Sequence, residues 1–306
     1  MKCPRCQNEY SDNARFCADC GIPLTPHPKK EAKAGKVIVG ILKTLCYIFL
    51  MVGIQNLVST VFLTTAVLSD SSLIIEGFDY EILVGRLEKI LYENISIILL
   101  VANLLIILFL SLFFTLRKKN PFDEVMLRPV KWRVLPFCAL YGIALNVFVS
   151  VTLTFLPLPT ELFEALDSQY ADLMGNTNIL IEILNTAVIT GLIEEIIFRG
   201  LAISRLKRGM SRGFAIAVSA VIFGLFHGAF LAVCYATVLG VVFGLLTERY
   251  DSIVPSVICH MFFNLTSFFL DIENGFVIMA VYFASAAILV LFSYLLFKRD
   301  SEEITE

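Results

Sequence analysis

Residues 95–116 read ISIILLVANLLIILFLSLFFTL, a stretch without a single charged side chain. A helix needs about 20 apolar residues to cross the hydrocarbon core of a bilayer, so this stretch is long enough to span one. Of the 306 residues in the chain, 58% are hydrophobic and 17% are charged, and the mean hydropathy is +0.80. Soluble domains are nearer half apolar and a quarter charged. The sequence therefore predicts an all-α polytopic membrane protein.

Apolar runs of similar length follow one another along most of the chain. Residues 214–247 hold no Asp, Glu, Lys or Arg. As a single helix they would reach about 51 Å, far beyond a hydrocarbon core of about 30 Å. We expect two short helices there, joined by a turn near His227 and Gly228. Irregular backbone at that depth in a membrane requires surrounding protein or a water-filled cavity. With that run counted twice, we predict eight spans: Val37–Leu68, Ile95–Leu116, Val134–Leu156, Ile179–Ser204, Phe214–Thr247 (two), Ile253–Leu270 and Phe276–Phe297.

The charged residues between these spans are segregated by sign, so the net charge of −3 says little about partners. The loop after the third span carries Glu161, Glu164, Asp167 and Asp172 and no Lys or Arg. Because cytosolic loops are rich in Lys and Arg, we expect a multi-pass protein of the cell membrane with both termini in the cytosol. The basic residues that mark the cytosolic side are Arg117, Lys118, Lys119, Arg128, Lys131, Arg133, Arg205, Lys207, Arg208, Arg212, Lys298 and Arg299.

Four cysteines near the N-terminus form two CxxC pairs, Cys3 with Cys6 and Cys17 with Cys20. Each pair can present two thiolates to one metal, and together they complete a tetrahedral shell that suits structural Zn²⁺. A module of about twenty residues cannot bury a useful core, so the metal would supply its folding energy. A pair of disulfides or four free thiols is the alternative, which a reducing cytosol disfavours.

The chain therefore divides into a zinc ribbon at 1–24, a cytosolic linker at 25–36 and a transmembrane domain at 37–300. The linker is rich in proline and lysine, which is typical of a segment at the cytosolic face. The polar first 36 residues do not have the pattern of a cleavable signal peptide. The other cysteines lie in apolar runs and are interpreted as buried packing residues: Cys46, Cys138, Cys234 and Cys259.

Four ionisable residues fall inside the predicted spans: Glu194, Glu195, His227 and His260. Such groups are costly in hydrocarbon and by default indicate a functional site. Counted along the helices from the nearest charged boundary, the depths of Glu194, His227 and His260 are about 13 to 22 Å. These depths overlap, so a single polar site near the midplane is geometrically feasible.

Helical spacing predicts which of these side chains face one another. Arg199 follows Glu195 by one turn, so the two can pair, whereas Glu194 points about 100° away from Glu195. Phe223 with His227, and His260 with Asn264, also share faces one turn apart. Each of these residues also has a purely structural interpretation. Glu195 and Arg199 could be a buried ion pair that stabilises the bundle, the histidines could be hydrogen-bonded core residues, and Asn264 could hold two helices together.

Three motifs now stand in order, about 30 residues apart: EExxxR at 194–199, FxxxH at 223–227 and HxxxN at 260–264. Together they resemble the CPBP family (CAAX proteases and bacteriocin-processing or immunity proteins, also called Abi) over roughly residues 130–270. Residues 1–21 are similar to the short zinc ribbons at the N-termini of many prokaryotic membrane proteins.

The resemblance implies an eight-helix glutamate-type intramembrane endopeptidase. By position, Glu194 would activate water and His227 would position that water. His260 and Asn264 would donate hydrogen bonds to the oxyanion, and Glu195 with Arg199 would brace the site or hold substrate, with Phe223 beside them. One Glu and two His could instead ligate a catalytic zinc, although no HExxH is present and the family is generally described as metal-independent.

Other classes of function remain open at this point. The same motifs could belong to a non-catalytic immunity or regulatory scaffold, or the buried Glu and His could relay protons in a small transporter. A transporter would be supported by an inverted internal repeat, and none is apparent. We expect a peptide or membrane-protein substrate, the lipid bilayer itself, and a cytosolic protein partner for the ribbon. Nucleic acid is a weaker expectation, because the ribbon is not strongly basic.

Overall fold

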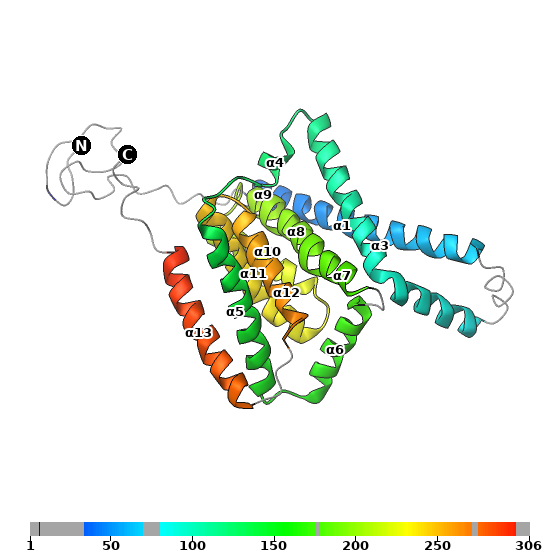
Figure 1. Cartoon of the computed structure of the whole chain (residues 1–306). Coiled ribbons are helices and arrows are strands. Elements are labelled where there is room, and N and C mark those ends of the chain that lie inside the picture. Colours follow the sequence, from blue (N-terminus) through cyan, green and yellow to red (C-terminus); the bar gives the residue numbers. More distant parts are fainter. Residues whose placement is uncertain (1–5, 7–33, 70–79, 175–177, 271–274, 298–306) are drawn as a thin grey trace.

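The computed structural model describes residue 6 and residues 34–69, 80–174, 178–270 and 275–297, and every element within these ranges is helical (Figure 1). The prediction of an all-α protein is confirmed. The elements are α1 (Ala34–Ser69), α3 (Tyr80–Leu116), α4 (Pro121–Glu124), α5 (Val134–Phe155), α6 (Thr160–Met174), α7 (Ile179–Glu182), η1 (Ile183–Thr190), α8 (Gly191–Glu194), η2 (Glu195–Ile203), α9 (Ser204–Leu206), α10 (Arg212–Leu225), α11 (Phe230–Tyr250), α12 (Val254–Ser267) and α13 (Gly275–Phe297).

In the described ranges, five helices are long and apolar enough to cross a membrane: α1, α3, α5, α11 and α13. The other predicted spans are shorter or composite. Helices α10 and α12 have 14 residues each. Within the described residues, the predicted count of eight spans is therefore roughly matched by the number of helices, and five of them reach spanning length as single regular α-helices.

One continuous composite helix runs from Ile179 to Leu206 and contains two stretches, η1 and η2, with the wider π-type hydrogen-bonding pattern. Such turns are uncommon in helices and often occur at functional sites. Glu194 is the last residue of α8, and Glu195 is the first residue of η2. The two carboxylates therefore lie where the helical pattern changes.

The long charge-free run is broken as predicted. Helix α10 ends at Leu225 and α11 begins at Phe230, and Gly228 between them has a φ of +73°. Glycine adopts this left-handed conformation without a steric cost. The two helices then pack closely, since a Cβ added at Gly240 would lie 2.9 Å from Ala220 Cα. Small residues at such crossings allow two backbones to approach in a membrane protein.

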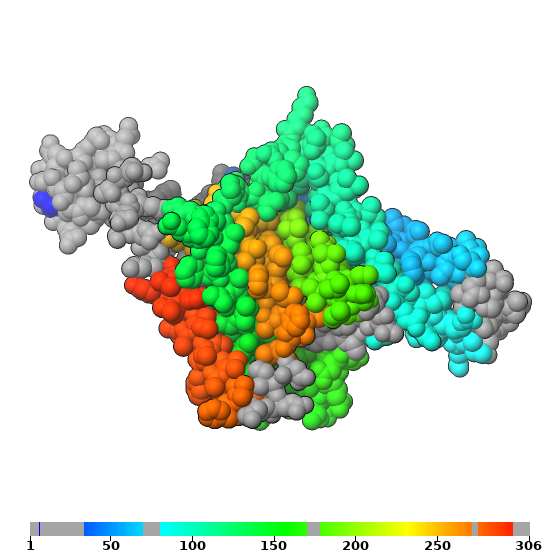
Figure 2. Space-filling model, in the orientation of Figure 1, coloured from blue at the N-terminus to red at the C-terminus, as the bar shows by residue number. Residues whose placement is uncertain are grey.

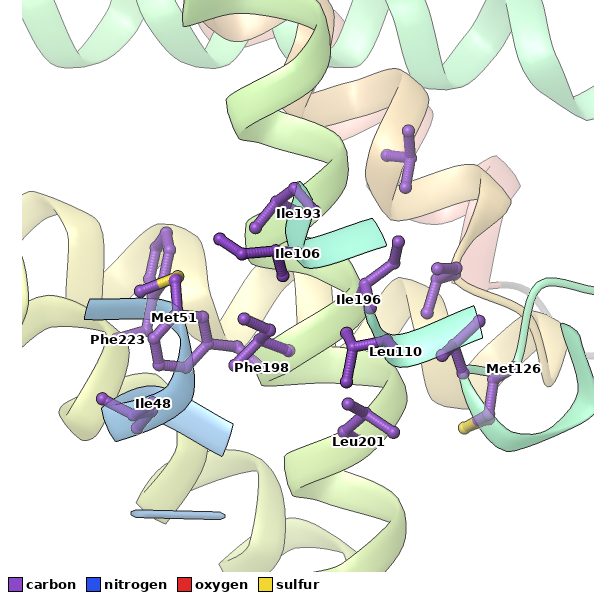
Figure 3. Close-up of a cluster of buried hydrophobic side chains, with 14 of the residues drawn as sticks. Ile48, Met51, Ile106, Leu110, Met126, Ile193, Ile196, Phe198, Leu201 and Phe223 are labelled. Carbon is purple, nitrogen blue, oxygen red and sulfur yellow. The ribbon is translucent and has the colours of Figure 1, made fainter. Parts of the chain in front are cut away.

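Helices α1 and α3 pack against each other and project together beyond the rest of the bundle (Figures 1 and 2). Ile48 and Met51 of α1 and Ile106 of α3 join a buried cluster with Ile193 and Phe198 of the composite helix (Figure 3). This cluster docks the two N-terminal helices onto the helix that carries the carboxylates. Helix α13 packs on α5 at the opposite side of the bundle.

The structure differs from the sequence-based expectations in three places. The acidic segment after α5, expected to be a loop, forms α6, whose apolar side joins a cluster with Leu231 and Ala232 of α11. Helix α3 begins at Tyr80, well before the predicted span at Ile95. Cys46 and Cys234 are exposed rather than buried, whereas Cys138 and Cys259 are buried as expected.

Helices α5 and α12 meet at Gly142, and this contact fixes the position of His260. A Cβ built on Gly142 would lie 2.1 Å from the carbonyl oxygen of Cys259, the residue before His260. We therefore expect Gly142→Ala to push the two helices apart and to lower the free energy of unfolding by about 1–3 kcal/mol, a typical cost of overpacking.

Thermal unfolding in detergent would measure this effect, with Gly53→Ala as the matched control. Gly53 lies inside α1, and its added Cβ would contact nothing within 4 Å. Because alanine is the better helix former, Gly53→Ala should not destabilise the protein. Equal behaviour of the two variants would contradict the close approach at Gly142.

Candidate active site

Glu194 and Glu195 are neighbours in sequence but occupy different environments. The side chain of Glu195 is 0% exposed, and that of its ion-pair partner Arg199 is 1% exposed. The side chain of Glu194 is 22% exposed and lines a cavity. The predicted difference in direction between the two carboxylates is therefore present: Glu195 points into packed protein, and Glu194 points into open space.

The expected ion pair between Glu195 and Arg199 is present, with Nη1 of Arg199 2.9 Å from Oε1 of Glu195. The guanidinium carbon lies 4.1 Å from the ring centre of Phe223 and 5.2 Å from that of Phe243. Aromatic faces attract cations, so the two rings compensate part of the lost hydration of this arginine. A carboxylate and a guanidinium are thus held in a dry environment behind the cavity.

His260 connects the two carboxylates. Its Nδ1 lies 2.9 Å from Oε1 of Glu195, and its Nε2 lies 3.6 Å from Oε2 of Glu194. An ionised carboxylate can only accept hydrogen bonds, so Nδ1 of His260 is the donor and Oε1 of Glu195 the acceptor. The ring stacks on Phe243, with centroids 4.8 Å apart and planes 24° apart. His260 therefore has a fixed orientation with one nitrogen directed at Glu194.

His227 lies in the break between α10 and α11. Its Nδ1 is 2.8 Å from the carbonyl oxygen of Phe223, one turn earlier. A carbonyl oxygen only accepts, so Nδ1 is the donor, and in the neutral ring Nε2 is then an acceptor. The backbone of the break is held from α6, because Oε1 of Gln169 accepts a hydrogen bond from Ala229 N at 2.7 Å.

Glu194, His227, His260 and Asn264 all line one cavity of about 290 Å³. The side-chain amide of Asn264 already makes one hydrogen bond, because its Nδ2 donates to the carbonyl oxygen of Thr186 at 3.2 Å. The three motifs, which are far apart in sequence, thus contribute side chains to a single polar space. The remaining walls are mostly apolar and aromatic: Met51, Leu99, Ile193, Phe223, Phe226, Tyr235, Leu239, Phe263 and Phe268.

Several polar residues of this cavity were not identified from the sequence. Gln55 of α1 donates to Asn103 of α3 at 3.4 Å, and Asn103 donates to Thr190 at 3.1 Å. Gln55, Asn103, Thr190 and Gln169 of α6 add further polar side chains to the lining of the cavity. The available sequence signal for Gln55 and Asn103 was that they are polar residues within apolar runs. Polar residues that only pack helices together give the same signal.

The predicted ribbon ligands Cys3, Cys17 and Cys20 lie outside the described residues, and Cys6 is described without them. Among the described residues, no cluster of three or more His, Cys, Asp or Glu side chains is arranged to hold a metal ion. Behind the cavity, Oε1 of Glu195 contacts both Arg199 and His260.

The fold and this site define a class: a multi-pass helical membrane protein with carboxylates and histidines around an internal cavity. Comparison with protein families makes the assignment specific. The family of type II CAAX prenyl endopeptidase Rce1-like proteins matches residues 176–266, and the zinc-ribbon family matches residues 2–24. The chain therefore carries an Rce1-like domain of the CPBP family and an N-terminal zinc-ribbon domain. Neither the curated proteins nor the solved structures that were compared gave a match.

Proposed function

We propose that this protein is an intramembrane endopeptidase in which Glu194 activates a water molecule for attack on a peptide bond. The match of residues 176–266 to an endopeptidase family supports the general activity. The observation that carries the specific proposal is that Glu194, His227, His260 and Asn264 line the same cavity. A carboxylate with access to water, beside oriented imidazoles, is the arrangement that general-base hydrolysis requires.

The charges of the site favour this role. Glu195 is paired with Arg199 behind the cavity, which leaves Glu194 as the carboxylate that faces open space, and the proposed mechanism uses His260 in its protonated form. In that state both nitrogens of His260 donate, Nδ1 to Glu195 and Nε2 toward the cavity. Glu194 then remains a carboxylate able to accept a proton.

The reaction follows from these positions. Glu194 takes a proton from water while the water oxygen bonds to the scissile carbonyl carbon, and Nε2 of His227 accepts a hydrogen bond from the O–H that remains on that oxygen. His260 and Asn264 donate to the oxyanion that forms, which is stabilised because the donors are already oriented. The carbon–nitrogen bond then breaks, and the proton held by Glu194 passes to the leaving amine. Glu195, Arg199 and Phe223 hold this arrangement from behind.

We further propose the domain division and the topology given by the sequence. The ribbon occupies residues 1–24, the linker residues 25–36 and the transmembrane domain residues 37–300, with its motif-bearing core at 130–270. Both termini would lie in the cytosol. The ribbon would bind structural Zn²⁺ through Cys3, Cys6, Cys17 and Cys20 and recruit a cytosolic protein partner. The substrate would be a peptide or membrane-protein segment.

The test is cleavage of a peptide library by the full-length protein in liposomes. We expect His227→Ala to lower the rate by about 10²-fold or more, the usual contribution of a residue that assists proton transfer. The matched control is His27→Ala, since His27 belongs to the predicted linker and should not affect cleavage. A folded wild-type protein that cleaves nothing would instead support the scaffold role.

A chelator arm separates the glutamate mechanism from a catalytic zinc. Cleavage by the glutamate mechanism should continue in the presence of a chelator. Because the predicted ribbon also binds zinc, the assay is repeated with full-length protein carrying Cys17→Ser and Cys20→Ser. Inhibition by chelator that persists in this variant would assign a metal to the cavity and overturn the proposed mechanism.

A further inference from the structure

Basic side chains gather at the end of the bundle where α1 begins, α3 ends and α9 lies. They form two adjoining pockets that are separate from the active-site cavity. The larger, of about 610 Å³, is lined by α1 and the segment around α9, and the smaller, of about 230 Å³, continues to the end of α3. Lys43, Arg205 and Arg208 line both pockets. The further basic residues that line them are Lys36, Arg117 and Lys119.

Close backbone contact between α1 and the α9 segment creates this arrangement. A Cβ on Gly40 would lie 3.1 Å from the carbonyl oxygen of Arg205, and a Cβ on Gly209 would lie 2.6 Å from the backbone nitrogen of Val37. The missing side chains allow the first turns of α1 to lie directly on this segment. Lysines of α1 and arginines of the α9 segment are therefore brought to the same pockets.

The acidic side chain of Glu124 lies among these basic residues. It forms ion pairs with Lys119 and Arg205. Burial alone would raise the pKa of Glu124, but the hydrogen bond from Lys119 and the charges of Arg205 and Lys119 hold the pKa below its ordinary value. Arg205 is also fixed by its bond to the hydroxyl of Ser204 at 2.8 Å. Glu124 thus organises two of the cations without neutralising the cluster.

Four cations of these pockets have no ion pair with an acidic side chain within the described ranges: Lys36, Lys43, Arg117 and Arg208. Lys43 lies about 13 Å along α1 from its first residue, inside the apolar run. A lysine at that depth extends its amine toward the polar boundary of the membrane. The pockets thus hold an excess of positive charge at the end of the bundle where α1 begins and α3 ends.

Beside the cations, the same two helices present apolar side chains. Ile38, Leu42 and Phe49 of α1 are exposed, as are Leu112 and Leu116 of α3. The aromatic rings of Tyr47, Phe113 and Phe114 line the smaller pocket. A basic recess beside a surface suited to hydrocarbon matches the two parts of a phospholipid. A free phosphate ion would use only the basic recess.

The general excess of basic residues on one side of a membrane protein does not account for these pockets. Lys131 and Arg133, counted among the cytosolic basic residues, are exposed and line neither pocket. We infer that the pockets between α1, α3 and α9 bind the headgroup phosphate of an anionic phospholipid, with the acyl chains lying along α1 and α3. Basic recesses between transmembrane helices recognise anionic headgroups in this way. This inference does not depend on the proposed peptidase activity.

The experiment titrates the full-length protein in non-ionic detergent with phosphatidylglycerol or phosphatidylcholine and follows the unfolding temperature. Phosphatidylglycerol should stabilise the wild type and phosphatidylcholine should not. Lys43→Gln with Arg208→Gln should weaken the apparent affinity for phosphatidylglycerol about tenfold or more, since each basic residue contributes roughly a fivefold factor near an anionic surface. Lys131→Gln with Arg133→Gln, which removes the same charge, should change it less than about threefold.

Several outcomes would overturn the inference. Equal weakening by the control pair would show diffuse attraction rather than a site. Equal stabilisation by both lipids would show that the pockets do not recognise the charge of the headgroup. Equal stabilisation by inorganic phosphate alone would show a site for free anions. If the first variant is itself less stable without lipid, Lys36→Gln with Arg117→Gln provides the same test, because both residues are exposed pocket residues.

Discussion

Glu194→Gln is expected to lower peptide cleavage by about 10³-fold or more, with the free energy of unfolding changed by no more than about 0.5 kcal/mol. Glutamine has nearly the same shape as glutamate and can still form hydrogen bonds, but it cannot take a proton from water. Glu194 lines the cavity, and Nε2 of His260 lies 3.6 Å from its Oε2. Its replacement therefore removes a reactive group and little packing.

The measurement is the cleavage rate in liposomes, together with thermal unfolding of the same samples. The matched control is Glu93→Gln on α3, where the glutamate is 44% exposed and distant in sequence from all three motifs. The control should cleave like the wild type. Cleavage by Glu194→Gln at the wild-type rate would exclude Glu194 as the base, whatever the role of the other cavity residues.

The sequence was sufficient for those parts of the site that depend on local spacing. One helical turn separates Glu195 from Arg199, and the structure contains their ion pair. The length and lack of charge of residues 214–247 predicted the break at Gly228. Both inferences use distances along a single helix, which the sequence determines directly.

The parts that could not be predicted depend on contacts between distant segments. Helix α6 was not predicted because it is not a charge-free run. It is amphipathic and carries acidic residues on its exposed side. Its Gln169 reaches the break beside His227 across 60 positions of sequence. Gln55 and Asn103 reach the cavity only because α1 and α3 dock on the composite helix. Nothing local distinguishes such residues from polar groups that merely join helices.

The family match covers residues 176–266, whereas the cavity extends beyond them. Met51 and Gln55 come from α1, and Leu99 and Asn103 come from α3. The cavity is therefore lined both by the matched segment, which carries the motif residues, and by helices outside it. A substrate in this cavity would contact both parts of the lining, so α1 and α3 are the place to seek determinants of specificity in this chain.

Glu195→Gln should have a different effect from Glu194→Gln, because it should destabilise the fold. It would leave the guanidinium of Arg199, which is 1% exposed, without its carboxylate. An uncompensated buried charge typically costs 3–5 kcal/mol, so we expect the free energy of unfolding to fall by about 3–5 kcal/mol. Cleavage should fall too, since Nδ1 of His260 would lose the carboxylate that orients its ring.

Denaturant unfolding in detergent would measure the loss, with Glu93→Gln again as the control. Glu93 pairs with Lys89 one turn away, as Glu195 does with Arg199, but that pair is exposed and 3.9 Å apart. Breaking an exposed pair should cost less than about 1 kcal/mol. Glu195→Gln with Arg199→Gln should then be more stable than Glu195→Gln alone, because the unpaired charge is gone. If the double variant is no more stable, the cost arises from packing around Glu195 rather than from the buried charge of Arg199.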